Sequence, residues 1–463
     1  MADKFNDDPE KTDTERFPTG PLKPGTSAVQ IRVRLELAQA LADLEPQLAS
    51  LTLPDSEQVA LSPLFELMHV LFGLGVRNCT WPLGITPALA KILTTEEKLE
   101  RITLIEVTLP SSRDAANAVD RLQRLAAVAN AVQVPNDAPP SHVGDPLMGH
   151  SDQDLEQQWY LFRMRVDQAW QYSAGADVVI ADIDYGFLTT HPDLRNLDLD
   201  KGFNTADLSK VVDHGTSIGH GTAVMGLAGA ALNGFGMIGV AHESSLWPIQ
   251  GNSGPGCRVP GDKWARGIDY VLASDSGGRP KVAILENQTG NGGCYEQVES
   301  TRLAITQAIN HGVVVVTAAG NGNRDVHKTD AGVEYPDSGS ILAVATGFHT
   351  VHNPRACFSN YGPRITVSAP GYSAFDLTCS IDPRSPHRVT FGGTSGAAPK
   401  VAGVCALMLS VNPCLTVSDI KSIFTATGSE VITSPNRLAG KFINAEAAVR
   451  AAMPAQAKSK KAP

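Results

Sequence analysis

The stretch Val313-Val-Val-Val-Thr-Ala-Ala-Gly-Asn-Gly322 decides the fold class of the larger part of the chain. An apolar, β-branched run that ends in glycine and asparagine is typical of a buried strand followed by a tight turn. Similar runs and helical stretches alternate around it: Val178–Ile183, 220–232, Leu246–Ile249, 262–274, Val282–Leu285, 296–311, Leu342–Ala345 and 394–411. This alternation predicts a three-layer α/β domain over residues 157–452, with a mostly parallel sheet between helices.

The region before this domain has a different composition. Residues 1–27 are polar and rich in proline and glycine, so we expect them to be disordered. Residues 28–98 carry apolar residues at helical spacing, which predicts a mainly helical region of unknown role. We expect residues 137–156 to form a linker and residues 453–463 a basic tail in solvent.

A small α+β unit is predicted between the helical region and the linker, over residues 99–136. Alternating apolar residues predict a strand over Ile102–Leu109, and a second strand is expected over Ala129–Val134. The helix between them has one apolar stripe and ends near Val128. A strand–helix–strand unit of this size buries little surface alone, so we expect it to dock on another part of the chain.

Composition limits the class of protein and of partner. The 463 residues are 42% hydrophobic and 19% charged, as in soluble globular proteins. Acidic residues outnumber basic ones by 48 to 38, which argues against nucleic acid or an anionic membrane as the main partner. The apolar run Leu61–Val76 is too short to span a bilayer. Without the apolar core of a secretory signal, a cytoplasmic protein is expected, with leaderless or specialised secretion as the alternative.

The seven cysteines predict neither a zinc site nor a dense disulfide framework. Their number is odd and no two of them form a Cys-x-x-Cys pair. A bridge between Cys257 and Cys294 is compatible with the sequence, and most of the others are expected to be buried thiols.

A candidate nucleophile and a candidate base stand in glycine-rich segments. Gly392-Gly-Thr-Ser-Gly-Ala-Ala-Pro399 places Ser395 at the start of an apolar helix, where free N–H groups favour developing negative charge. A plain helix cap is the simpler interpretation of its position alone. A serine becomes a nucleophile beside a base, and the small residues around His220 leave that imidazole accessible. His214 lacks a following helix and is interpreted as a loop residue.

An acid and an amide complete the candidate site. The strand over Val178–Ile183 leads to Asp182 and Asp184, and the carboxyl ends of parallel strands are where open α/β sheets place functional groups. Either carboxylate could orient an imidazole, and because strand residues alternate, both lie on the same face. Asn321 could donate to an oxyanion, although Asn-Gly is also a common turn pair.

Together these segments resemble the subtilisin-like (S8) serine peptidase family over about residues 157–450. The order acid, histidine, serine is the order found in subtilisin itself. The family's aspartate lies two residues before a glycine and seven before the histidine of a His-Pro-Asp-Leu segment, as Asp184 does with respect to Gly186 and His191. Asp182 does not satisfy this spacing.

The resemblance implies a catalytic triad of Asp184, His220 and Ser395, with Asn321 in the oxyanion hole. It implies a serine endopeptidase that hydrolyses peptide bonds through an acyl-enzyme, with protein or peptide substrates as partners. It also implies that residues 101–135 act as an inhibitory prodomain. No cofactor or metal ligand is expected; structural calcium is compatible with the family, but no calcium loop can be placed.

Two segments depart from the family pattern. Asp184-Tyr-Gly186 stands where the family usually has Asp-Thr-Gly or Asp-Ser-Gly, and Leu285-Glu-Asn-Gln-Thr-Gly290 replaces a Ser-Leu-Gly run in the wall of the specificity pocket. Gln288, Thr289 and Gly290 are therefore the predicted substrate-binding residues, without a predicted side-chain preference. The alternatives are a catalytically silent or zymogen-locked binding or regulatory protein, and a peptide ligase or cyclase that uses the same acyl-enzyme.

Overall fold

The chain divides into two compact units, residues 1–135 and residues 136–463. The division lies one residue from the boundary expected between residues 99–136 and the linker. The structure, a computed structural model, describes residues 27–33, 67, 70–71, 79–80, 91–94, 104–109, 115–125, 128–134, 137–138, 158–213, 217–251, 261–328, 332–347, 353–372 and 376–454.

The first unit is built on a four-stranded sheet in the order β2-β3-β1-β4. Its elements are β1 (Ser27–Val33), β2 (Cys79–Thr80), β3 (Leu104–Leu109), α6 (Ala115–Gln123) and β4 (Val128–Val134). β1 lies between β3 and β4 and is antiparallel to both, with Ile31 opposite Ile105 on one side and Ala131 on the other. The strand–helix–strand order expected over residues 99–136 is therefore present, but its two strands are separated by a third.

The expectation of a mainly helical region over residues 28–98 is wrong for two segments. β1 and β2 are strands, and the alternation of apolar and polar residues in Ser27–Val33 has the two-residue period of a strand. Described residues of this region that are helical include Leu67, Val70 and Leu71. Most of the expected disordered segment, linker and basic tail lies outside the described residues.

The second unit contains an eight-stranded sheet in the order β16-β13-β12-β11-β9-β6-β8-β7. Every pairing in this sheet is parallel. The strands are β6 (Val179–Asp184), β7 (Phe203–Asn204), β8 (Ser245–Gln250), β9 (Lys281–Leu285), β11 (Val313–Ala318), β12 (Ile341–Thr346), β13 (Val367–Pro370) and β16 (Lys441–Phe442). The five apolar runs of the sequence are its central strands.

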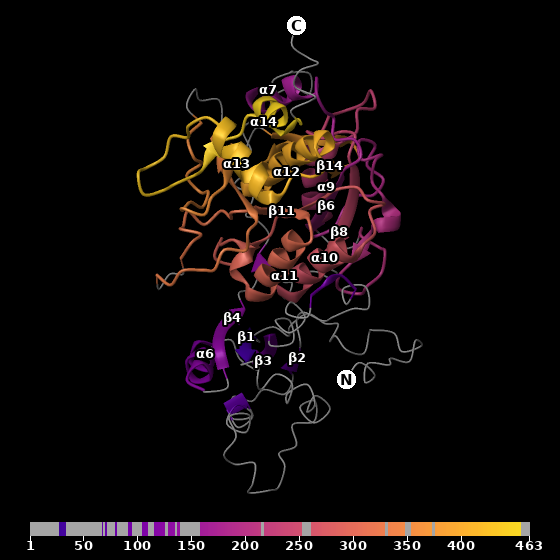
Figure 1. Cartoon of the computed structure of the whole chain (residues 1–463). Helices are drawn as coiled ribbons and strands as arrows, with labels where there is room; N and C mark the ends of the chain where they lie inside the picture. Colours follow the sequence, from indigo (N-terminus) through magenta and orange to yellow (C-terminus); the bar gives the residue numbers. More distant parts are fainter. Residues whose placement is uncertain are drawn as a thin grey trace, which may run out of the picture. The chain divides into compact units, whose positions relative to one another are not determined.

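Helices cover both faces of this sheet. Figure 1 shows α9, α12, α13 and α14 on one side of it and α10 and α11 on the other. The helices are α7 (Trp159–Arg163), α8 (Val166–Ala169), α9 (Ile218–Gly229), α10 (Gly261–Ala273), α11 (Glu299–Asn310), α12 (Thr394–Val411), α13 (Val417–Thr427) and α14 (Ala445–Ala452). The expected three-layer α/β architecture is confirmed.

The helix α12 is the centre of the core. Its residues Thr394–Leu409 are buried, and together with α9 and the central strands they form the largest apolar cluster. Among the described residues it is the one helix long and apolar enough to cross a membrane, and 89% of that stretch is buried inside the protein. A helix that is apolar all round and buried in this way is typical of a core helix.

Two short antiparallel sheets complete the second unit. β14 (Asp376–Asp382) and β15 (Ser385–Phe391) form a hairpin that packs against α9 and ends three residues before α12 begins. β5 (Asp137–Ala138) pairs with β10 (Gln288–Thr289), which follows β9. The hairpin leads directly to Ser395, and β10 carries two of the predicted substrate-binding residues.

Candidate active site

The acid and the histidine lie side by side at the carboxyl edge of the sheet. Asp184 is the last residue of β6, and His220 lies in the first turn of α9. His220 Nδ1 is 2.7 Å from Asp184 Oδ2 and 2.9 Å from Oδ1, and both residues are buried. Because a carboxylate can only accept, Nδ1 carries the proton and Nε2 keeps its lone pair. This is the tautomer that a general base requires.

Small residues let α9 approach the strand that carries Asp184. A Cβ on Gly221 would lie 2.6 Å from the Gly186 carbonyl oxygen and 2.7 Å from the Phe187 ring, so only glycine fits there. Gly186 itself has φ +129°, in the region that favours glycine. The imidazole is further held by the edges of Tyr185 and Phe391, whose ring centroids lie 5.8 and 5.4 Å from that of His220.

Ser395 is the second residue of α12, in the position predicted for it. Gly393 precedes the helix with φ +75°, and Ser395 is buried. Within the described residues, neither Ser395 Oγ nor His220 Nε2 has a hydrogen-bond partner. These are the two atoms between which the proposed proton transfer occurs, and such pairs commonly tighten only when substrate binds. The helices α9 and α12 that carry them pack against each other.

Asn321 lies beside the start of the same helix. Thr394 N–H and Thr394 Oγ1 both donate to Asn321 Oδ1, over 3.0 and 3.2 Å. A backbone N–H cannot accept, so the amide oxygen must face Thr394. Asn321 Nδ2 is thereby the end left to donate elsewhere, as an oxyanion hole needs. The sequence analysis did not predict that Thr394 orients this amide. Its position directly before Ser395 could have indicated a role in the site.

The two competing acids occupy different environments. Asp182 is fully buried, and neither of its carboxylate oxygens has a hydrogen-bond partner among the described residues. Burial raises the pKa of Asp182 well above its ordinary value, and the nearby charge of Asp184 raises it further. His220 Nδ1 contacts Asp184 Oδ2 at 2.7 Å, whereas Asp182 has no hydrogen-bond partner among the described residues, so the imidazole pairs with Asp184. His214, the other candidate histidine, lies outside the described residues.

Glu286 is a second buried acid that the sequence reading did not single out. Its two carboxylate oxygens also lack partners within the described part of the chain. Burial raises its pKa well above the ordinary value, and the charges of Asp182 and Asp184 raise it further. In the sequence, its one distinguishing feature is that it lies in Leu285–Gly290, a segment that differs from the family pattern.

The predicted substrate-binding residues lie next to Asn321. Gln288 Oε1 accepts from the Asn321 backbone N–H over 3.0 Å, and Thr289 Oγ1 accepts from Gly293 N–H over 2.9 Å. Gln288 and Thr289 are buried and Gly290 is exposed. β10 pairs antiparallel with a short strand of the chain itself, with Gln288 opposite Ala138 and Thr289 opposite Asp137.

Known proteins share the sequence and fold of this unit. Residues 175–442 match the model of the Subtilase family. Thermitase from Thermoactinomyces vulgaris is 30% identical over 294 residues, which cover 62% of this chain and 94% of thermitase. Subtilisin DY from Bacillus licheniformis is 31% identical, over 60% of this chain and 92% of its own.

Longer relatives match over a smaller share of their length. An extracellular basic protease from Dichelobacter nodosus is 29% identical over 66% of this chain, and the chain spans 57% of its length. An extracellular protease from Xanthomonas campestris is also 29% identical, over 73% of this chain, and the chain spans 63% of its length. A solved protease from Pseudoalteromonas arctica superposes with a TM-score of 0.53 at 27% identity, covering 65% of this chain and 98% of that one. On the match over residues 175–442, the chain belongs to the subtilase family.

Proposed function

We propose that the protein is a serine endopeptidase in which Ser395 is the nucleophile. The observation that carries the proposal is the buried Asp184–His220 pair, with Nδ1 2.7 Å from the carboxylate and Nε2 left free. Ser395 Oγ is also free, at the start of a helix that packs on the helix of His220. Membership of the subtilase family and the protease names of the relatives support the same function.

The reaction is acyl transfer. His220 Nε2 takes the Ser395 proton as Oγ attacks a peptide carbonyl, and Asp184 stabilises the imidazolium that forms. Asn321 Nδ2 and the Ser395 backbone N–H stabilise the negative oxygen of the tetrahedral intermediate. His220 then protonates the leaving amine, and water hydrolyses the acyl-enzyme by the same steps. Every group in this scheme belongs to the protein, so we expect no cofactor in the chemistry.

Substrates bind as extended strands along β10. The pairing of Asp137–Ala138 with Gln288–Thr289 supports this, because a segment of the chain already adds a strand at that edge. Since this segment follows the first unit directly, we also propose that the chain cleaves itself after residue 138 and that residues 101–135 act as the inhibitory prodomain.

A labelling experiment tests the activity. Purified full chain is incubated with a fluorophosphonate probe and with casein, beside a Ser395→Ala variant. We expect the wild type to be labelled at Ser395 and to hydrolyse casein, and the variant to lose activity by about 10⁶, as in subtilisin itself. An unlabelled wild type, before and after removal of its N-terminal unit by added protease, would falsify the proposal.

Mass spectrometry of the same two proteins tests self-processing. Cleavage between residues 138 and 157 in the wild type but not in Ser395→Ala supports it, and cleavage in both assigns it to a contaminant. Labelling without any turnover of casein would point to the silent or zymogen-locked protein, and transfer of the acyl group to an added amine would point to a ligase. No contact among the described residues favours either alternative.

The location proposed for this activity is outside the cytoplasm. The two longer relatives are named as extracellular, which conflicts with the cytoplasmic location expected above. We therefore propose that the protein acts outside the cell. Immunoblots of medium and lysate against a cytoplasmic marker test it: the protein in the lysate alone would restore the cytoplasmic expectation.

A further inference from the structure

Two arginines of the second unit share one hydrogen-bond acceptor and one aromatic ring. Arg355 Nη2 and Arg437 Nη1 each donate to Asn323 Oδ1 over 3.1 Å, so these two nitrogens lie no more than 6.2 Å apart, twice that length. The two guanidinium carbons lie 5.2 and 5.1 Å from the centroid of the Tyr361 ring. Two positive charges therefore meet beside an exposed asparagine. We call Arg355, Arg437, Asn323 and Tyr361 the arginine cluster.

Three loops of the parallel sheet bring the arginine cluster together. Asn323 follows β11, Arg355 and Tyr361 lie between β12 and β13, and Arg437 precedes β16. The Asn323 N–H donates to the Phe358 carbonyl oxygen over 2.7 Å, which joins the first two loops. Asn323 has φ +49°, a left-handed conformation that asparagine tolerates better than most residues. The fold therefore holds the acceptor, and with it the two charges, in a fixed place.

No carboxylate neutralises these charges within the described part of the chain. The contacts of Arg355 and Arg437 with described residues all go to neutral groups, and Arg355 Nη1 donates to two backbone carbonyl oxygens. Asp325, the acid closest in sequence to Asn323, accepts from the His327 N–H over 2.8 Å instead. Burial lowers the pKa of Arg355, and the charge of Arg437 lowers it further. Bringing the two arginines together thus costs free energy that an anion would offset.

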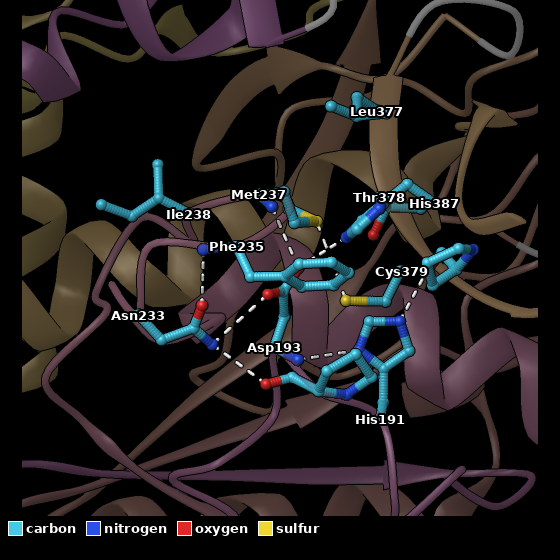
Figure 2. Close-up of polar contacts among 12 residues, drawn as sticks. His191, Asp193, Asn233, Phe235, Met237, Ile238, Leu377, Thr378, Cys379 and His387 are labelled. Atoms are coloured by element: carbon cyan, nitrogen blue, oxygen red, sulfur yellow. Dashed lines mark hydrogen bonds and ion pairs between the residues drawn. The ribbon is translucent and has the colours of Figure 1, made fainter. Parts of the chain in front are cut away.

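Other basic side chains of the same unit lie directly against a carboxylate. Arg364 Nη1 is 2.5 Å from Glu296 Oε1. Figure 2 shows the same arrangement for His387, whose Nε2 lies 2.6 Å from Asp193 Oδ2. A carboxylate from another molecule would complete this kind of pairing at the arginine cluster.

The arginine cluster keeps donors for such a carboxylate. A guanidinium has five N–H donors in a planar fork, and two parallel N–H bonds to one carboxylate are its strongest contact. Arg437 donates to the described residues through Nη1 alone, so none of these contacts uses its Nη2 or Nε. Arg355 Nε is buried without a partner among the described residues. Because Tyr361 and Asn323 already orient both guanidinium groups, little side-chain freedom is lost when an anion binds.

The arginine cluster lies within reach of a bound substrate. Asn323 stands two residues after Asn321, the proposed oxyanion donor, so their Cα atoms are at most about 7.6 Å apart. An asparagine and an arginine side chain extend beyond that, which places the charges on the order of 10–15 Å from the cleaved bond. An extended peptide advances about 3.3 Å per residue. The distance therefore corresponds to about three or four substrate residues.

We propose that the arginine cluster is a subsite for a carboxylate of the substrate, so that the protein prefers peptides with aspartate or glutamate about three or four residues from the cleaved bond. The proposal rests on the endopeptidase function proposed above. An asparagine of the same shape is a poor replacement, because its N–H groups meet the N–H groups of the guanidinium. The chain carries a formal charge of −10, so it does not attract acidic peptides in general. The preference therefore depends on these two side chains.

Matched peptide substrates test the subsite by kinetics. A good neutral substrate receives a single aspartate at each position on either side of the cleaved bond in turn, and each peptide has an asparagine twin. We expect kcat/KM of the aspartate peptide to exceed that of its twin by about 5–10-fold at one position or two adjacent ones, the size of a partly exposed ion pair. Elsewhere the ratio should be close to one. This comparison in the wild type needs no variant.

Variants assign the preference to the arginine cluster. Arg437→Gln keeps a donor for Asn323 but removes the charge, and should bring the ratio of the twins close to one. Arg437→Lys keeps the charge but not the planar fork, and should keep part of the ratio. Arg450→Gln is the matched control, because it removes a positive charge on α14, where Arg450 lies 3.6 Å from Glu446, and should leave the ratio as it is.

A binding assay separates this proposal from the function on which it rests. Fluorescence polarisation follows labelled twin peptides on the full-length Ser395→Ala chain, with inorganic phosphate as competitor. Tighter binding of the aspartate peptide that requires Arg437 and is weakened by phosphate would support the subsite even if the wild type cleaves nothing. Cleavage of all twins at equal rates would leave the peptidase in place and overturn the subsite. Equal binding of the twins, including none for either, or phosphate binding without a preference for aspartate, would overturn it where no cleavage occurs.

Discussion

Asn321 is held in one orientation beside Ser395, so its replacement should slow the chemical step of catalysis. Its oxygen accepts from Thr394, so the Nδ2 protons face away from Thr394 and are available to donate to an oxyanion. Asn321→Ala should lower kcat by about 10²–10³ with little change in KM, the loss known for the equivalent amide of subtilisin itself. Thr394→Val keeps the backbone N–H that holds Asn321, and should cost far less. Steady-state kinetics on a peptide substrate measure both, and equal losses would mean that Asn321 acts only through packing.

The buried acid Glu286 should make the protein less stable as pH rises. In the unfolded chain it releases its proton near its ordinary pKa of about 4.3. Burial raises the folded pKa, so between the two values the folded state retains a proton that the unfolded state has lost. Stability is then complete below the unfolded pKa and falls as pH rises toward the folded one.

Glu286→Gln removes this loss and should stabilise the protein most at alkaline pH. Urea unfolding in the Ser395→Ala background measures it: the variant should exceed its parent at about pH 8, and the gain should shrink toward about pH 4. A gain independent of pH would assign the effect to packing instead of proton release.

At the scale of elements, α12 is tied to the hairpin by a buried ion pair. Lys400 Nζ lies 2.5 Å from Asp376 Oδ2, donates to the Pro370 carbonyl oxygen and sits over the Tyr160 ring, and neither charged side chain is exposed. Lys400→Met leaves the carboxylate buried and unpaired and should cost about 3–5 kcal/mol. Changing both residues, Lys400→Met with Asp376→Leu, should restore most of that stability. Urea midpoints decide, and a double variant no better than the single one would contradict the pairing.

The strand β10 should bind substrates through their main chain. In an antiparallel pair, hydrogen-bonded and non-bonded positions alternate along the strand. Methylating the backbone nitrogens of a good peptide substrate, one at a time, should therefore lower kcat/KM at alternate positions, by roughly tenfold or less each. The unmethylated peptide is the control. A uniform loss, or a loss that follows side-chain identity, would argue against strand addition.

Periodicity in the sequence was enough to place the elements of the second unit. The run Val313–Ala318 and the helix 394–411 have the bounds found in the structure, because buried strands and an apolar core helix depend on local composition. β1 was not recognised as a strand. Its identity depends on pairing with β3 and β4, whose paired residues lie 72 to 106 positions away (104 − 32 and 134 − 28), and local patterns do not encode partners.

At the scale of the whole molecule, the candidate site could be placed because its motifs are short and specific. Ser395, His220 and Asn321 each stand in a glycine-rich segment where an element begins or ends, and the fold collects those ends at one edge. The choice of Asp184 depended on the spacing found in the family, since the alternation of strand residues alone could not distinguish it from Asp182. The raised pKa of Glu286 was out of reach of sequence reasoning, because it arises from burial beside Asp182 and Asp184, which are remote in the sequence.

The contacts around Asn321 also bear on how the protein ages. An Asn-Gly pair is prone to deamidation, in which the glycine nitrogen attacks the side-chain carbonyl, and here that would turn an amide donor into a carboxylate. Gly322 N–H donates to Asn360 Oδ1 over 3.0 Å, which holds this nitrogen away from the attack. The Asn360→Ala variant should therefore lose activity during storage, at the rate at which peptide maps show Asn321 converted to aspartate. Wild-type protein stored under the same conditions is the control and should keep its asparagine. Loss of activity without conversion of Asn321 to aspartate would show that Asn360 does not act by preventing deamidation.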